Sequence, residues 1–299
     1  MNNETDKKGK RIGIILYPSF DTLDVIGAHQ VFHYACKFNP GSEVILIGPG
    51  KEDLQHPLLA PYRAAAAKAA VKSGEGLELG MDITYKTYLG SGDAYALDVV
   101  YVPGAMQTYL PLYFSKKKSD NPFFQLLDKA RQQAEVIASV CTGALLLGTA
   151  GYLKARRVTT HWQSANLLRQ FPGVTVAAGF PRYVVDENIV TGGGISSTID
   201  EALAITTLIF DQDTAEKAQL IMQYNPAPPV HSGDPDAASP RIMFETSKQS
   251  ELPYEPGFTG LNDHSFLYYL EHGCIPPDTD AASQGVLGTE EGDQPAGAI

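Results

Sequence analysis

Cys141 is the residue whose setting points most directly to chemistry. It follows the short apolar run Val136–Ser139 and precedes Thr142, Gly143 and an apolar helical stretch. Ligands of α/β sheets bind at the carboxyl ends of strands, and a helix N-terminus beside a thiol favours the reactive thiolate. We therefore expect Cys141 to be a nucleophile at a tight strand-to-helix turn, with Gly143 leaving room for that turn. The alternative is a buried structural cysteine, a frequent fate of free thiols.

Asp24 is the carboxyl group expected beside this thiol. It follows a predicted strand at 11–17 and a short loop, so it too should lie at the carboxyl end of a strand. Packed among Leu23, Val25 and Ile26, its carboxyl would have a pKa raised by desolvation, which suits a group that donates and accepts protons. The alternative is that Asp24 only caps the helix that follows.

Several donors near these residues are candidates for holding negative charge that develops on a substrate. They are the backbone N–H groups of Gly104 and Ala105, in the loop after Val99–Val102, and the N–H and hydroxyl of Thr142.

His161 and Trp162, the only tryptophan, follow a further predicted strand. His161 could orient a substrate, or it could begin a helix and bond to backbone. The Gly192-Gly193-Gly194 triplet precedes a helix that holds Asp200, but it lacks the spacing of a dinucleotide fingerprint. The sequence contains neither a Walker motif nor a cluster of metal ligands, so we expect no metal and no cofactor.

The predicted elements that position these residues alternate between strands and helices. Short apolar runs indicate strands, and apolar residues on a helical period indicate helices. The pattern predicts an α/β fold with a mainly parallel sheet and helices on both faces. Strands are expected at 11–17, 43–47, 99–102 and 136–139, a hairpin at 184–190, and helices at 25–35, 123–133, 197–210 and 214–224, the last capped by Asp213.

One domain at 11–243 is expected to make up most of the chain. Residues 1–10 are polar and are expected to form a disordered leader, whereas 244–299, rich in Pro, Gly and acids, should form an irregular extension in which 266–270 docks as one helical turn. Residues 54–76 look like an insertion that forms a short surface helix and a candidate lid.

Composition narrows the class of protein. A net charge of −11 over 299 residues argues against a nucleic-acid partner. Cys36, Cys141 and Cys274 are odd in number and far apart, which suits a reducing compartment better than a disulfide framework. The chain shows no secretory leader and no run of about 18 apolar residues. We expect a cytoplasmic protein that contacts neither nucleic acid nor membrane.

Five segments together resemble the PfpI-type branch of the glutamine-amidotransferase-like superfamily, and within it the isonitrile hydratases. They are YPSFDTLDVIGAHQVF from Tyr17, VCTGALLLGTAGYL from Val140, RRVTTHW from Arg156, TGGGISSTIDEAL from Thr191 and QYNPAPPVHSGDP from Gln223. The resemblance implies a flavodoxin-like sandwich, a homodimer, and a nucleophile at Cys141 with Thr142 beside it. It implies Asp24 as the acidic partner. Asp200 would belong to the site, or would cap or orient a neighbour.

The activity that the resemblance implies is hydration of an isonitrile, R–N≡C, to the N-substituted formamide, without a cofactor. Cys141 would add to the terminal carbon and form a thioimidate, with Asp24 acting first as acid and then as base. The chain departs from its relatives at Ala105, where they usually have a second glycine, and at Ala28, where they have proline.

Three alternatives remain open. A glyoxalase-like or deglycating enzyme would act on reactive carbonyls, but relatives with that chemistry tend to have histidine where Thr142 stands. A transcriptional regulator would need a basic helix-turn-helix module, and the segment after the core is acidic. A redox sensor would oxidise Cys141 without turnover.

Overall fold

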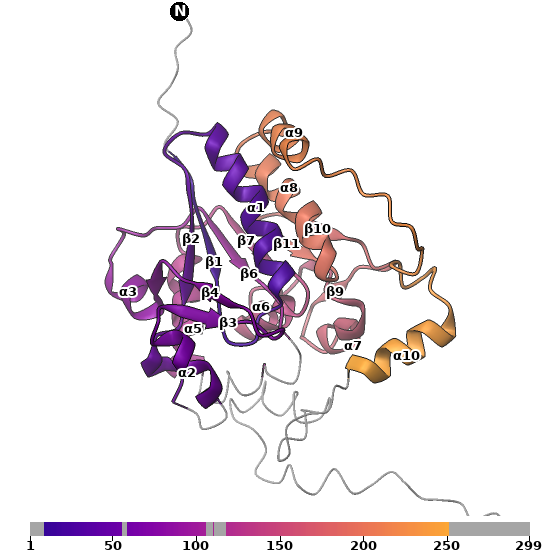
Figure 1. Ribbon diagram of the computed structural model, residues 1–299, viewed down its shortest axis with the longest axis horizontal. Helices are drawn as coiled ribbons and strands as arrows, with labels where there is room; N and C mark the ends of the chain where they lie inside the picture. The colour runs from indigo at the N-terminus through magenta and orange to yellow at the C-terminus, as the bar shows by residue number, and fades with distance from the viewer. Residues whose placement is uncertain (1–8, 56–58, 106–109, 111–117, 251–299) are drawn as a thin grey trace, which may run out of the picture.

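The computed structural model describes residues 9–55, 59–105, 110 and 118–250 (Figure 1). Most of the predicted leader and the predicted helical turn at 266–270 lie outside the described residues. Lys10 belongs to the folded part, because its backbone N–H donates to Ser42 Oγ at 2.9 Å.

A seven-stranded sheet forms the centre of the fold, in the order β10-β11-β7-β6-β1-β2-β5. Neighbouring strands are parallel except β10 and β11, which form the predicted hairpin. The strands are β1 (Arg11–Ile15), β2 (Glu43–Gly48), β5 (Ile83–Thr84), β6 (Val99–Val102), β7 (Val136–Ser139), β10 (Tyr183–Asp186) and β11 (Ile189–Gly192). The structure therefore confirms a mainly parallel α/β sheet.

Helices cover both faces of this sheet (Figure 1). The central strands bury alternate side chains against each layer. Val99 and Tyr101 of β6 pack with apolar residues of α1 and α8, whereas Val100 and Val102 pack with those of α5 and α6. The first layer contains α1 (Thr22–Phe38), α8 (Thr198–Ile209) and α9 (Gln212–Ile221), and the second contains α3 (Tyr85–Gly90), α5 (Pro122–Ala130) and α6 (Gly143–Ala150). Such burial on both faces explains why these strands are apolar throughout.

Smaller elements flank the sheet. They are the antiparallel hairpin of β3 (Ala70–Lys72) and β4 (Glu78–Gly80), the parallel pair β8 (Arg157–Val158) and β9 (Thr175–Val176), the helices α2 (Ala60–Ala66), α7 (Ala165–Leu168) and α10 (Pro240–Ser250), and the short 3₁₀ helices η1 (Lys51–Asp53), η3 (Lys118–Asp120), η4 (Trp162–Ser164) and η5 (Ile195–Ser197). Helix α2 is the short helix expected in the 54–76 insertion. The β3–β4 hairpin, which begins in that insertion, was not predicted.

Several boundaries differ from the sequence prediction: β1 ends at Ile15 rather than at residue 17, and α5 ends at Ala130 rather than at residue 133. Helix α1 begins at Thr22 rather than at residue 25. Helix α9 is capped by Asp211, not by Asp213, because extended Asp211 accepts a hydrogen bond from the Thr214 N–H at 2.8 Å. Helix α10 continues past residue 243, where an irregular extension was expected to begin.

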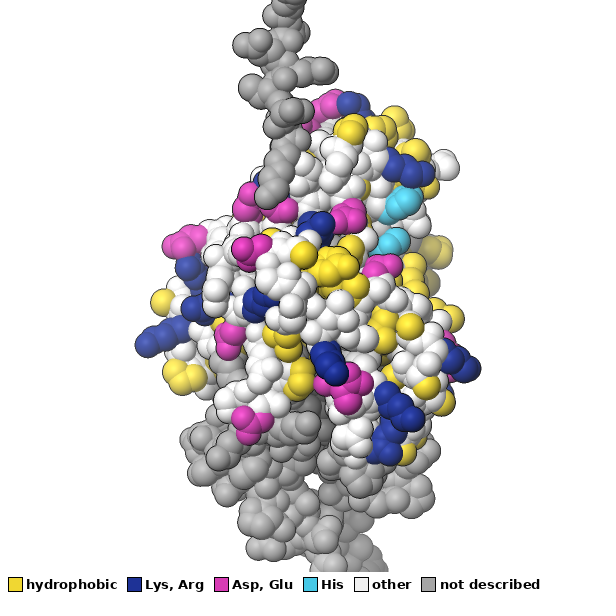
Figure 2. Space-filling model, turned by 90° about the vertical axis from the view of Figure 1, so that its left-hand side faces the viewer, with side chains coloured by type: hydrophobic (Ala, Val, Ile, Leu, Met, Phe, Trp, Pro, Cys, Tyr) yellow, Lys and Arg dark blue, Asp and Glu magenta, His cyan; other side chains and the backbone are white. Residues whose placement is uncertain are grey.

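The described surface carries charges of both signs. On the face drawn in Figure 2, basic and acidic side chains are interspersed rather than gathered into separate areas. No helix in the described part of the chain is both long and apolar enough to span a membrane.

Candidate functional site

Cys141 occupies a strained turn between β7 and α6. Its φ of +56° lies in the left-handed region, which residues other than glycine rarely adopt. Hydrogen bonds hold this conformation: the Cys141 N–H donates to Gly193 O at 2.9 Å, and Thr160 Oγ1 donates to Cys141 O at 2.7 Å. Gly143 is needed because an added Cβ would lie 2.7 Å from Pro103 O. The predicted tight strand-to-helix turn is therefore present.

Asp24 lies in the first turn of α1, fully buried beside the thiol. Its Oδ2 accepts a hydrogen bond from the Gly104 N–H at 2.7 Å, and its Oδ1 lies 3.4 Å from the Thr198 hydroxyl. The capping alternative is wrong for Asp24, because Asp21 occupies the N-cap position. Gly104 lies between the two groups, since a Cβ there would be 2.6 Å from Cys141 Cβ and 2.8 Å from Asp24 Oδ2.

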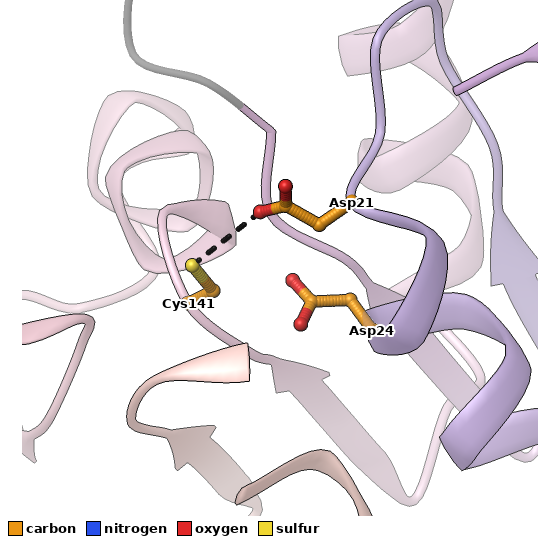
Figure 3. A group of neighbouring side chains, drawn as sticks. All are labelled: Asp21, Asp24 and Cys141. Carbon is orange, nitrogen blue, oxygen red and sulfur yellow. Dashed lines mark hydrogen bonds between the residues drawn. The ribbon is translucent and has the colours of Figure 1, made fainter. Parts of the chain in front are cut away.

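Asp21 is a member of the site that the sequence reasoning missed. Its Oδ2 lies 3.7 Å from Cys141 Sγ as a hydrogen-bond acceptor, and Asp24 points into the same space (Figure 3). The sulfur and carboxylate oxygens of the three residues lie within 4.8 Å of one another. The sequence Asp21-Thr22-Leu23-Asp24 contains a sign of this contact. Two acids three residues apart share one face of a helix, so a site that holds Asp24 can also hold Asp21.

The spacing of these three groups also resembles that of a metal site. Among the described residues, it is the one group of three or more His, Cys, Asp or Glu side chains close enough to suggest such a site. Asp21 accepts a hydrogen bond from the thiol, and Asp24 accepts one from the Gly104 N–H. These bonds explain why the three groups lie together, and we describe them as a proton network.

Burial and mutual repulsion set the protonation of the network. Desolvation, followed by the charge of Glu75, raises the pKa of Asp21 to about 6. Desolvation, followed by the charge of Asp21, raises the pKa of Asp24 well above its ordinary value. Burial therefore favours the protonated form of Asp24, whereas Asp21, with a pKa of about 6, is mostly ionised at neutral pH.

The thiol itself is held in its protonated form. Burial, followed by the charges of Asp24 and Asp21, raises the pKa of Cys141, and the hydrogen bond from the Thr142 N–H offsets only part of this. The sequence argument from the helix N-terminus predicted a thiolate, and this prediction is wrong for the resting site. Burial and two neighbouring carboxyl groups outweigh the helix end.

The expected oxyanion donors are already engaged. The Gly104 N–H donates to Asp24, and the Ala105 N–H donates to Thr142 Oγ1 at 2.8 Å. The Thr142 hydroxyl in turn donates to Ala105 O at 2.6 Å. Thr142 thus holds the 103–105 loop against the turn at Cys141. The methyl group of Ala105 does not disturb these two hydrogen bonds.

His161 makes the contacts expected of a histidine that begins a helix and bonds to backbone. It stands at the N-cap position of η4, and its Nδ1 accepts a hydrogen bond from the Gln163 N–H at 3.4 Å. Burial lowers the pKa of His161 to about 4, so the ring is neutral at pH 7. The Trp162 ring lies 5.8 Å from the His161 ring. Roles for His161 and Trp162 in substrate binding remain predictions.

Asp200 is tied to the surface layer. It forms an ion pair with Arg182 and accepts a hydrogen bond from the Tyr224 hydroxyl at 3.1 Å. Together with Tyr183 and Gln219 it lines a surface hollow of about 340 Å³. These contacts match the alternative in which Asp200 orients a neighbouring side chain. A role for Asp200 in the site remains a prediction.

Glu201, which the sequence reasoning also missed, is the acid of α8 that faces inward. It is fully buried, and its Oε2 accepts a hydrogen bond from the Tyr101 hydroxyl at 3.1 Å. Desolvation raises the pKa of Glu201, and the charge of Asp24 raises it further. Burial therefore favours the neutral form of Glu201.

Comparison with known proteins places this site in a family. The model of the DJ-1/PfpI family matches residues 10–208. The chain belongs to the DJ-1/PfpI family. An isonitrile hydratase from Pseudomonas putida is 33% identical over 240 residues, which cover 80% of this chain and 90% of that protein.

Solved structures of similar proteins agree with the fold. A THiJ/PfpI family protein from Pseudomonas syringae is 26% identical, with a TM-score of 0.65 over 84% of this chain and 92% of that one. An AraC family transcriptional regulator from Pseudomonas putida is 16% identical, with a TM-score of 0.53 over 71% of this chain and 99% of that one. At that identity the likeness concerns the fold alone. The family match includes Asp21, Asp24 and Cys141.

Proposed function

We propose that this protein hydrates isonitriles to N-substituted formamides, with Cys141 as the nucleophile. The observation that carries the proposal is the position of the Cys141 thiol, whose sulfur lies within 4.8 Å of the carboxylate oxygens of both Asp21 and Asp24. Burial raises the pKa of both carboxyl groups, and we assign the base to Asp21 and the acid to the more deeply buried Asp24. Such a pair supplies a base and an acid at one pH. The 33% identity to an isonitrile hydratase supports this choice of substrate.

In the first half-reaction the sulfur adds to the terminal carbon of R–N≡C. Asp21, ionised at neutral pH and the hydrogen-bond acceptor of the thiol, takes the proton from Sγ. Asp24 donates its proton to the carbon that the sulfur attacks. The product is the thioimidate R–N=CH–S on Cys141, with Asp21 now protonated and Asp24 ionised.

In the second half-reaction water converts the thioimidate to the formamide. Asp24 accepts a proton from the water whose oxygen bonds to the carbon, and Asp21 donates its proton to the nitrogen. The adduct R–NH–CH(OH)–S then collapses with cleavage of its C–S bond, and the hydroxyl proton returns to the sulfur through Asp21. R–NH–CHO leaves, and the thiol, ionised Asp21 and protonated Asp24 are restored.

Formamide production from cyclohexyl isocyanide and p-tolyl isocyanide tests the proposal. Wild type should turn over, Cys141→Ala should not, and Asp24→Asn should lose about 10²- to 10⁴-fold in rate, the usual contribution of a positioned acid or base. Cys36→Ala is the matched control and should retain activity, because Cys36 lies near the C-terminal end of α1, about 18 Å along the helix from Asp24. Turnover by Cys141→Ala, or none by folded wild type, would refute the proposal.

A redox-sensing role for Cys141 is less well supported. Oxidation by peroxide proceeds through the thiolate, and the site holds Cys141 as a thiol.

A further inference from the structure

The β3–β4 hairpin is bonded to the loop that leads into α1. The Ser19 N–H donates to Lys72 O at 3.0 Å, and the Gly74 N–H donates to Phe20 O at 3.0 Å. The hairpin therefore follows the chain up to the residue before Asp21, and its turn reaches the beginning of the helix that holds both acids of the site.

Glu75, at the tip of this hairpin, contacts the first residue of α1. The Thr22 N–H lies 3.2 Å from Glu75 Oε2 and 3.4 Å from Oε1, and the Thr22 hydroxyl lies 2.6 Å from Oε2. The Thr22 hydroxyl also lies 2.9 Å from Ser73 Oγ. A carboxylate on the first N–H of a helix satisfies a free donor and favours the positive end of the helix dipole.

Asp21 has the backbone of a capping residue without the side-chain contact of one. It stands at the N-cap with φ −71° and ψ 124°, and its carboxyl makes no capping hydrogen bond. Aspartate is among the residues most favoured at this position because its carboxylate accepts from the next turn. Here that carboxylate lies against Cys141 Sγ instead.

We propose that Glu75 is a positioning residue that caps α1 in place of Asp21 and so holds the Asp21 carboxyl on the Cys141 thiol. The proposal rests on the function proposed above, in which Asp21 is the base for that thiol. The groups that face Asp21 are Glu75 from the hairpin, Asp24 from α1 and Cys141 from the turn before α6. Without Glu75, the Thr22 N–H and hydroxyl lose their carboxylate acceptor, and we expect the neighbouring Asp21 carboxylate to turn towards this end of the helix, since its contact to sulfur is long at 3.7 Å.

Two readouts of opposite sign test this role. When Asp21 turns from the thiol towards the helix end, turnover loses its base, but the thiol loses a neighbouring negative charge that raises its pKa. In Glu75→Ala we therefore expect kcat to fall roughly tenfold, and we expect iodoacetamide to alkylate Cys141 roughly threefold faster at pH 7. Glu75→Gln keeps an acceptor for Thr22 and should restore most of both.

The design separates positioning from loss of structure. Cys36 lies in the same helix, so unchanged alkylation of Cys36, resolved by peptide mass spectrometry, shows that α1 is intact. Glu78→Gln is the matched control, because Glu78 is another exposed acid of the hairpin, 3.6 Å from Lys68. It should change neither readout.

The decisive comparison is the double variant Asp21→Asn, Glu75→Ala. If Glu75 acts through Asp21, adding Glu75→Ala to Asp21→Asn changes neither turnover nor alkylation of Cys141 further. Additive effects, or unchanged Cys141 alkylation in Glu75→Ala alone, would overturn the proposal. Alkylation does not need the isonitrile reaction, so this arm decides the role of Glu75 even where the proposed function fails.

Discussion

Replacing Asp21 by Asn should make the protein more stable and less active. The pKa of Asp21 rises from an ordinary 3.8 to about 6 on folding. A difference of that size disfavours the ionised carboxyl in the folded protein by about 3 kcal/mol. Asn carries no charge, so Asp21→Asn should raise the free energy of unfolding at pH 7.5 by up to about 3 kcal/mol.

The pH dependence of this gain has a definite sign. The group has a raised pKa in the folded state, so wild type is least penalised below the unfolded pKa and loses stability as pH rises through about 6. The advantage of Asp21→Asn should therefore shrink to about half at pH 5 and vanish below about pH 4. Urea unfolding of both proteins at pH 7.5 and pH 5 measures it.

Turnover should move in the opposite direction. Asp21 must be ionised to accept the thiol proton, so wild-type kcat/KM should fall as pH drops below about 6. Asp21→Asn should lose this limb together with about 100-fold in rate. Asp213→Asn, at an exposed position of α9, is the control: it loses only a surface ion pair with Lys217, so it should change the free energy of unfolding by less than about 1 kcal/mol and leave turnover unchanged. An Asp21→Asn variant that is less stable than wild type at pH 7.5, or equally active, would refute the reasoning.

Three further predictions concern Gly104, Thr142 and His161. Gly104→Ala should abolish turnover and lower the melting temperature, because its Cβ would lie 2.6 Å from Cys141 Cβ; normal activity would contradict the packing. Thr142→Val loses both hydrogen bonds to Ala105 and should lower the free energy of unfolding by about 1–3 kcal/mol in urea titrations, with reduced turnover. His161→Gln should leave the shape of the pH–rate profile between pH 6 and 8 unchanged, since His161 is already neutral there, and a shifted limb would count against this.

The sequence predicted well what depends on local pattern. The strands at 99–102 and 136–139 and the turn at Cys141 follow from short apolar runs that end before polar or small residues. The sequence also indicates the tight turn at Cys141, because it places the glycine that the turn requires at position 143.

The sequence predicted poorly what depends on distant contacts. The contact of Asp21 with Cys141 joins residues on different elements, and it exists beside a cap supplied by Glu75 from an unpredicted hairpin. The protonation of the thiol was predicted from the helix end alone, whereas burial and Asp24 decide it.

In α8 the sequence pattern singles out Asp200 and not its neighbour Glu201. Asp200 pairs with Arg182 at the surface, whereas Glu201 points into the core beside Tyr101. Adjacent helix positions lie about 100° apart, so a shift of one residue exchanges a surface acid for a buried one.

Covalent catalysis requires a bond between the Cys141 sulfur and the isonitrile carbon. Rapid quenching of the protein with excess p-tolyl isocyanide, followed by peptide mass spectrometry, detects this bond. The Cys141 peptide should gain the mass of one isocyanide during turnover, and Cys141→Ala should form neither the adduct nor the formamide. Formamide production by Cys141→Ala, or an adduct that forms on Cys36 instead, would contradict covalent catalysis by Cys141.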